Sequence, residues 1–169
     1  MEELSRALMT RESGLASDFR GKPGRRQITV LARASWEAAC KEIDADLPWT
    51  ARRANLLVEG IDLKGKLGYD LRVGDAVLRI TGETTPCRRM DEACEGLMAA
   101  LKPKWRGGVT ASVIREGEAR VGCQAVLTRN ILSQYSAVAG HHLRRNLKRA
   151  RRIAGKAART LGILRPQGA

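Results

Sequence analysis

The sequence predicts a mainly β protein: a small β-barrel with inserted helices and a basic C-terminal helix. Short apolar segments rich in β-branched residues are separated by glycine and aspartate turns, and acidic residues disappear from the last third of the chain. Five or more short strands with helices inserted between them favour a curled or closed sheet over alternating βαβ units. The predicted organisation is a barrel domain at residues 1–130 and a helical extension at 131–169.

Apolar periodicity predicts the order of the elements. Runs of β-branched residues indicate strands, and a period near 3.6 residues indicates helices. In chain order we expect a helix at 2–9, a strand at 27–32, a helix at 35–43, several short strands between 55 and 82, a helix at 91–101, and strands at 109–115 and 120–127. Ser35 is the expected N-cap of the first long helix, and Pro103 ends the second.

Length and composition fit one ordinary globular domain with an appendage. Of the 169 residues, 43% are apolar and 29% are charged, which excludes collagen-like and wholly disordered classes. No apolar run reaches the roughly 18 residues of a membrane span, and Met1-Glu2-Glu3 is acidic where a secretory signal would be basic. We therefore expect a cytoplasmic protein without a membrane span.

The basic charge is a property of the C-terminal third. Residues 1–118 hold 20 basic and 18 acidic side chains, a net charge of +2, whereas residues 119–169 hold 11 basic and no acidic ones. From Leu143 to Leu164, leucine and alanine recur at steps of four and three, which indicates a helical seam. We favour docking of this seam on its own domain, with the basic face open to an acidic partner. Nucleic-acid binding is the alternative.

Cys87 has the surroundings of a reactive thiol. It follows Pro86 at the end of a predicted strand and precedes Arg88 and Arg89. A thiol acts as a nucleophile or soft-metal ligand only as the thiolate, which neighbouring cations favour. The alternative is a buried cysteine that serves as a small apolar residue.

The other three cysteines have less distinctive positions. Cys40 lies on the apolar face of a predicted helix and Cys123 lies in a predicted strand, so both are expected in the core. Cys94 is a candidate resolving thiol for Cys87. The four cysteines form no CxxC pair and no zinc-type cluster, which indicates free thiols.

An ordered set of short motifs resembles the MOSC domain, the module named after the C-terminal part of molybdenum cofactor sulfurases. In chain order the motifs are Gly14-Leu15 with Asp18, Arg26-Gln27-Ile28-Thr29-Val30, Arg53-Ala54-Asn55-Leu56, Gly60-Ile61-Asp62-Leu63, Leu71-Arg72-Val73-Gly74, Pro86-Cys87, Arg106-Gly107-Gly108-Val109, Gly117 and Val121-Gly122. The resemblance covers residues 14–127 and implies a barrel-like fold rich in strands. Only thirteen residues precede Gly14, where the family has a further strand, so an incomplete barrel is one expectation. The family's Val-Gly-Asp near the final strand is Val121-Gly122-Cys123 here.

The resemblance implies a functional role for Cys87. In the sulfurases the matching cysteine carries sulfur as a persulfide for delivery to the molybdenum cofactor, and in amidoxime-reducing relatives it is similar to a direct molybdenum ligand. Candidate residues for binding the phosphate of the pterin cofactor are Arg26, Arg53, Asn55, Arg88 and Arg106. Each arginine is equally compatible with a solvated charge, and Asn55 with a turn cap.

The resemblance also implies partners. Pyridoxal phosphate is associated with the family, but this chain has no aminotransferase-like region with a Schiff-base lysine. A sulfur donor such as a cysteine desulfurase would supply the sulfur, and a molybdoenzyme is a possible recipient of the cofactor. The alternatives are a non-catalytic pterin- or anion-binding module and a protein that binds nucleic acid or an acidic partner through its C-terminal helix.

Overall fold

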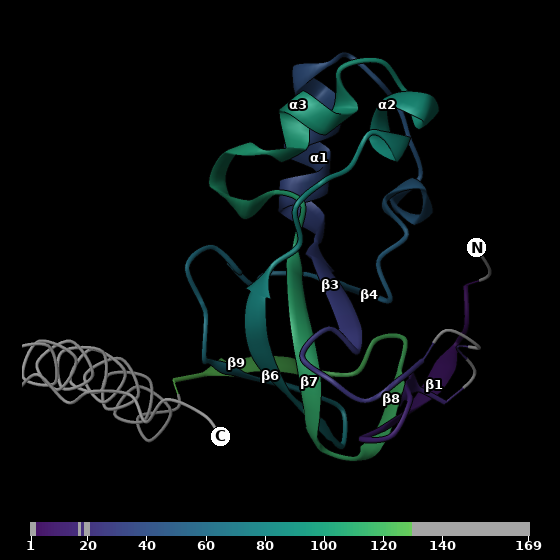
Figure 1. Ribbon diagram of the computed structural model, residues 1–169, viewed down its shortest axis with the longest axis vertical. Coiled ribbons are helices and arrows are strands. Elements are labelled where there is room, and N and C mark those ends of the chain that lie inside the picture. The colour runs from purple at the N-terminus through teal and green to yellow at the C-terminus, as the bar shows by residue number, and fades with distance from the viewer. Residues whose placement is uncertain (1–2, 17, 19–20, 130–169) are drawn as a thin grey trace, which may run out of the picture. The chain divides into compact units, whose positions relative to one another are not determined.

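The computed structural model describes residues 3–16, 18 and 21–129, and this part of the chain is mainly β (Figure 1). The predicted C-terminal helix, with its leucine and alanine seam and its basic face, lies outside the described residues. None of the helices in the described part of the chain has the length and apolarity that crossing a membrane requires.

A curled six-stranded sheet in the order β4-β3-β7-β6-β5-β9 forms the body of the fold. Its strands are β3 (Ile28–Ala32), β4 (Leu56–Val58), β5 (Asp70–Val73), β6 (Ala76–Glu83), β7 (Val109–Arg115) and β9 (Ala125–Thr128). Only β3 and β4 pair in parallel. A parallel pair needs a long crossover, which the helix between these two strands provides. The predicted mainly β fold class is confirmed.

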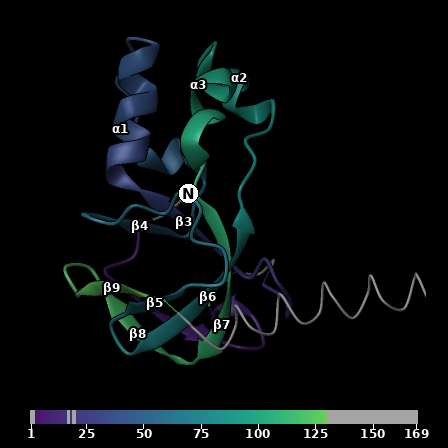
Figure 2. The same ribbon diagram turned by 90° about the vertical axis from the view of Figure 1, so that its left-hand side faces the viewer.

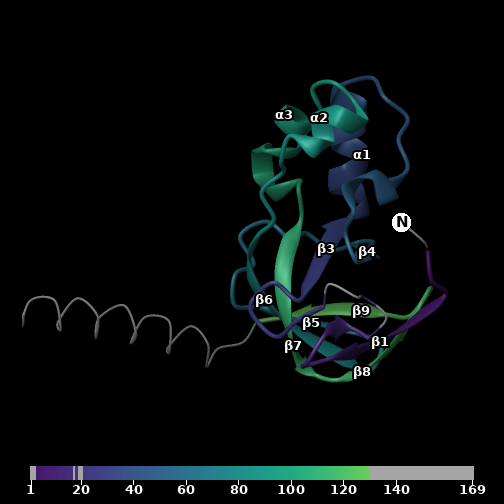
Figure 3. The same ribbon diagram turned by 45° about the vertical axis from the view of Figure 1, so that its right-hand side comes forward.

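A three-stranded sheet in the order β2-β1-β8 lies at the end of the fold remote from the helices (Figure 3). It comprises β1 (Arg6–Thr10), β2 (Gly14–Leu15) and β8 (Gly117–Arg120). The helix expected at 2–9 is therefore wrong. So short a helix is marginal without tertiary support, whereas pairing with two strands satisfies the backbone and buries Met9 completely. β1 does place a strand ahead of Gly14.

The helices gather at the opposite end of the large sheet (Figure 2). They are α1 (Arg33–Glu42), α2 (Arg89–Ala93), α3 (Leu97–Leu101) and two 3₁₀ turns, η1 (Trp49–Arg52) and η2 (Pro103–Trp105). The single helix expected at 91–101 is interrupted by Gly96, whose φ of +81° lies in the left-handed region. The helix expected from Ser35 begins at Arg33, and Ala32 at its N-cap makes no capping hydrogen bond through its side chain.

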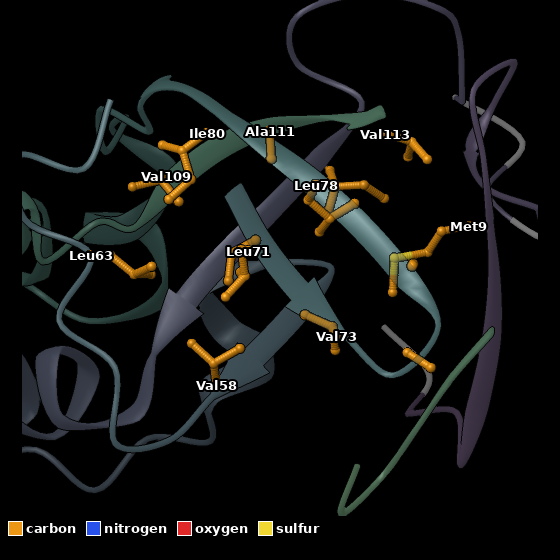
Figure 4. Close-up of a cluster of buried hydrophobic side chains, with 14 of the residues drawn as sticks. Met9, Val58, Leu63, Leu71, Val73, Leu78, Ile80, Val109, Ala111 and Val113 are labelled. Carbon is orange, nitrogen blue, oxygen red and sulfur yellow. The ribbon is translucent and has the colours of Figure 1, made fainter. Parts of the chain in front are cut away.

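Two aliphatic clusters hold these layers together. The larger one lies inside the curl of the sheet, where Leu71, Leu78 and Val109 are completely buried (Figure 4). The smaller one joins the helices to β3 through Leu31, Leu97 and other buried side chains. The segment between β6 and α2 runs from the first cluster to the second, so packing at both ends fixes its path.

Candidate cysteine site

Cys87 lies on this connecting segment, residues 84–88, and its side chain is exposed. In Figure 1 the segment runs from the upper end of β6 to α2. Thr84 and Pro86 are buried, as is Met90 in the first turn of α2. The Met90 N–H donates to the Cys87 carbonyl at 2.9 Å, which closes that turn. Buried residues on both sides thus anchor the segment and leave the sulfur open to solvent.

Gly107 allows the start of β7 to press against this segment. A Cβ atom at Gly107 would lie 2.5 Å from the Thr84 carbonyl oxygen and 3.3 Å from Cδ of Pro86. The Thr84 N–H also donates to the Gly108 carbonyl at 2.9 Å. The glycine pair in the matched motif thus permits a close approach between two backbones, the role that glycine uniquely fills.

Arg52 is the buried cation of the site. Its side chain is 8% exposed, and its Nε and Nη2 donate to the carbonyls of Gly107 and Thr84 at 2.9 and 3.0 Å. Burial lowers the pKa of Arg52, and the charge of Cys87 opposes that shift. The guanidinium therefore clamps the residues just ahead of β7 to the cysteine-bearing segment.

Sequence reasoning missed Arg52 and chose its neighbour. Arg53 is exposed and has a left-handed φ of +59°, so the chain turns between two adjacent arginines and sends only the first one inward. The one available signal was the doubled arginine ahead of a buried strand. Nothing in the sequence indicates which of the two faces the core.

The structure does not bring the other predicted arginines together around Cys87. Arg26 is exposed, and the side chain of Arg88 is 91% exposed with its Nε 3.8 Å from Glu92. Arg106 is half-buried, forms a short ion pair with Glu42 and donates to the Ala100 carbonyl at 3.0 Å.

Asn55 ties the start of β4 to β3. Its Oδ1 accepts hydrogen bonds from the backbone N–H and the hydroxyl of Thr29, both at 2.8 Å. Its own N–H donates to the Thr29 hydroxyl at 3.0 Å. The side chain thus has a structural role at the strand entrance.

Two of the matched motifs meet at an open groove of about 470 Å³ where α1 begins. The loop after β4 contributes Gly60, Ile61 and Asp62, and the opposite wall includes Arg106. The basic side chains of the lining are Arg33, Lys64, Lys104 and Arg106, against one carboxylate, that of Asp62. In the described part of the chain neither lysine forms an ion pair, and the first turn of α1 holds no acidic residue. Of the two arginines, Arg33 pairs with Glu59 and Arg106 with Glu42, so the two lysines are the basic side chains that the groove offers to an anionic group such as a phosphate.

The remaining cysteines are less accessible than Cys87. Cys40 is buried, as expected, and burial raises the pKa of its thiol. Cys94 is half-buried and packs against the cluster between the helices and β3. The expectation that Cys123 lies in the core within a strand at 120–127 is wrong: a turn with Gly122 at a φ of +82° separates β8 from β9, and Cys123 lies there, half-buried against the cluster inside the sheet. Among the described residues, no group of three or more His, Cys, Asp or Glu side chains is arranged to hold a metal ion.

A curled sheet that presents one exposed cysteine between a strand and a short helix defines a small β protein with a thiol site. The sequence profile of the MOSC domain matches residues 16–126. The chain belongs to the MOSC domain family.

Solved structures agree on the fold. The YuaD protein from Bacillus subtilis superposes with a TM-score of 0.62 at 17% identity, over 76% of this chain and 88% of that one. YiiM from Escherichia coli superposes with a TM-score of 0.60 at 17% identity, over 75% of this chain and 63% of that one. YiiM from Geobacillus stearothermophilus gives 0.54 at 15% identity, over 74% of each chain. The match spans less than two thirds of the Escherichia coli structure and of a further hypothetical protein, 62% of which is covered. No curated protein matches the sequence.

Proposed function

We propose that this protein binds molybdenum cofactor, or a related anionic compound, and carries sulfur as a persulfide on Cys87. The observation that carries the proposal is that Cys87 is exposed on a segment whose Thr84 carbonyl binds the buried guanidinium of Arg52. An accessible thiol next to a fixed cation is the arrangement that nucleophilic and metal-binding cysteines share. Membership of the MOSC domain family supports this proposal.

The described residues fit an anionic cofactor. The groove at the start of α1 offers the basic side chains that bind phosphate. The Thr84 hydroxyl is buried without a hydrogen-bond partner among the described residues. Cys87 would be the soft ligand for molybdenum, and the bound cofactor would supply the redox chemistry of the metal. For Arg26, Arg53, Asn55 and Arg88, a binding role remains a prediction.

Sulfur loading on Cys87 needs a donor persulfide, such as that of a cysteine desulfurase. The Cys87 thiolate attacks the terminal sulfur of the donor. A new sulfur–sulfur bond forms at Cys87, the donor's own sulfur–sulfur bond breaks, and the donor leaves as a thiolate. No external oxidant is consumed. An acceptor thiolate would take the terminal sulfur in turn: it forms a new sulfur–sulfur bond, and Cys87 leaves as the thiolate.

Intact mass spectrometry tests sulfur loading. After incubation with a cysteine desulfurase and cysteine, the wild-type protein is expected to gain one sulfur atom that a reducing thiol removes. Cys87→Ala is expected to gain none, and Cys94→Ala is the matched control that still gains it. Equal loading of the Cys87→Ala variant would refute the proposal.

A non-catalytic pterin- or anion-binding module is the second candidate, favoured by the groove at the start of α1. Molybdenum and pterin content, measured on protein purified from its own host, separates the two. A cofactor that remains bound in Cys87→Ala, in a protein that acquires no sulfur, supports the binding module. Cofactor lost together with Cys87 supports direct ligation.

A further inference from the structure

Arg52 carries a buried positive charge that the described residues do not neutralise. Its hydrogen bonds go to two backbone carbonyls, and no described carboxylate pairs with it. Carbonyl dipoles satisfy the N–H groups of a guanidinium but leave its net charge in place, and burying an unpaired charge is costly. The site therefore favours an anion near this guanidinium.

Arg52 lies against the segment that carries Cys87, because its Nη2 donates to the Thr84 carbonyl at 3.0 Å. The carboxylates of α2 are engaged elsewhere: Glu92 lies 3.8 Å from Arg88, and Asp91 Oδ1 accepts the Met98 N–H at 2.8 Å. Cys87 thus lies on a segment bound to a buried cation that no described carboxylate neutralises.

A second polar group at the same segment is left unsatisfied by the described residues. The hydroxyl of Thr84, a residue 7% exposed, has no hydrogen-bond partner among them, although the carbonyl of Thr84 binds Arg52. Buried hydroxyls are almost always paired, so the segment that carries Cys87 holds both an uncompensated charge and an unpaired hydroxyl.

We propose that the Cys87 site selects anionic over neutral reaction partners, and that Arg52 is the residue that determines this selectivity. The inference rests on the proposed function in one respect: the reacting atom is the sulfur of Cys87. It goes further by naming the class of compound that reaches the sulfur. Arg52 acts through its field and through the position it gives to the segment, since its side chain is buried.

Two alkylating reagents with the same leaving group provide the test. Iodoacetate is an anion and iodoacetamide is neutral. With both, the thiolate forms a bond to carbon and iodide leaves. The ratio of their rate constants at Cys87 is therefore independent of the fraction of thiolate. Rates are followed by mass spectrometry of the Cys87 peptide in the full chain.

We expect the ratio of iodoacetate to iodoacetamide rates at Cys87 to exceed that of N-acetylcysteine amide by roughly tenfold at low salt. Arg52→Gln is expected to abolish most of this preference and Arg52→Lys to keep it. Arg89→Gln removes an exposed charge near Cys87 and is expected to change the ratio by about twofold or less.

A wild-type ratio equal to that of N-acetylcysteine amide would overturn the inference, even if no Arg52 variant folds. A folded Arg52→Gln protein with the wild-type ratio would overturn the role of Arg52. Sulfur loading on Cys87 without anion preference would refute only the selectivity. Anion preference without sulfur loading would refute only the sulfur carriage.

Discussion

Gly107 and Thr84 approach each other so closely that any side chain at position 107 would force one of the two backbones to shift. A Cβ atom there would lie 2.5 Å from the Thr84 carbonyl oxygen, well inside contact distance. The Gly107 carbonyl and the Thr84 carbonyl both accept hydrogen bonds from Arg52. This three-way contact fixes the segment that carries Cys87.

Replacing Gly107 with alanine is expected to push the Thr84–Cys87 segment away from β7. The free energy of unfolding, measured with urea, should fall by about 1–3 kcal/mol, the usual cost of forcing an extra methyl into a packed site. Gly82→Ala is the matched control, because its Cβ atom would meet only the Thr110 hydroxyl at an ordinary 3.5 Å. Equal free energies of unfolding for the two variants would show that the backbones at Gly107 and Thr84 leave room for a methyl group.

Replacing Thr84 with valine is expected to stabilise the fold by about 1 kcal/mol, because it removes a buried hydroxyl that has no partner. Thr110→Val provides the contrast. Thr110 is 3% exposed, and its hydroxyl contacts that of Thr81 at 3.1 Å and the Gly82 carbonyl at 3.3 Å. Thr110→Val should therefore destabilise. If both substitutions destabilise equally, the Thr84 hydroxyl has a partner in solution.

Two substitutions of Asn55 test whether its side-chain oxygen, as a hydrogen-bond acceptor, stabilises the start of β4. Aspartate keeps an oxygen that accepts from Thr29, whereas alanine leaves the Thr29 N–H and hydroxyl without this partner. We expect Asn55→Ala to lose about 1–3 kcal/mol of stability in urea unfolding and Asn55→Asp to lose less. Sulfur loading of Cys87 in Asn55→Asp should match the wild type. A loss of loading with unchanged stability would assign Asn55 to the site instead.

The buried thiol of Cys40 makes stability depend on alkaline pH. Because burial raises the pKa of Cys40 above its ordinary value of 9.0, the native state keeps this proton where the unfolded chain has lost it. Its contribution is complete below about pH 9 and declines as the pH rises, with a slope of at most about 1.4 kcal/mol per pH unit.

Urea unfolding between pH 8 and 10.5 measures this decline. The wild type should lose stability relative to Cys40→Ala as the pH rises, while Cys123→Ala, which lacks a half-buried thiol, should parallel the wild type. Parallel curves for wild type and Cys40→Ala would contradict the burial of this thiol.

Much of the fold could be predicted because periodicity and turn residues act locally. The strand from Ile28 and the helix that follows it were placed within two residues, since both have a clear apolar pattern. The prediction of an N-terminal helix was wrong because Leu8 and Met9 are both apolar. Only the pairing of β1 with β8 determines that Leu8 is exposed and Met9 is buried. Local sequence patterns do not reveal which strands pair when they lie far apart in the chain.

The candidate site was harder to predict than the fold. Cys87 could be named, because a cysteine after proline and before two arginines is a local pattern. Arg52 could not, because its partners, Thr84 and Gly107, lie 32 and 55 residues away in the sequence. The groove at the start of α1 likewise joins side chains from separated segments.

Locating the transferred sulfur among the four cysteines tests the central claim most directly. The wild-type protein, loaded by a cysteine desulfurase and trapped by alkylation, is digested and the persulfide is assigned by peptide mass spectrometry. We predict that the persulfide lies on the Cys87 peptide, because Cys87 is the exposed cysteine of the four. A persulfide on Cys94 or Cys123, or none on any of the four, would contradict the account.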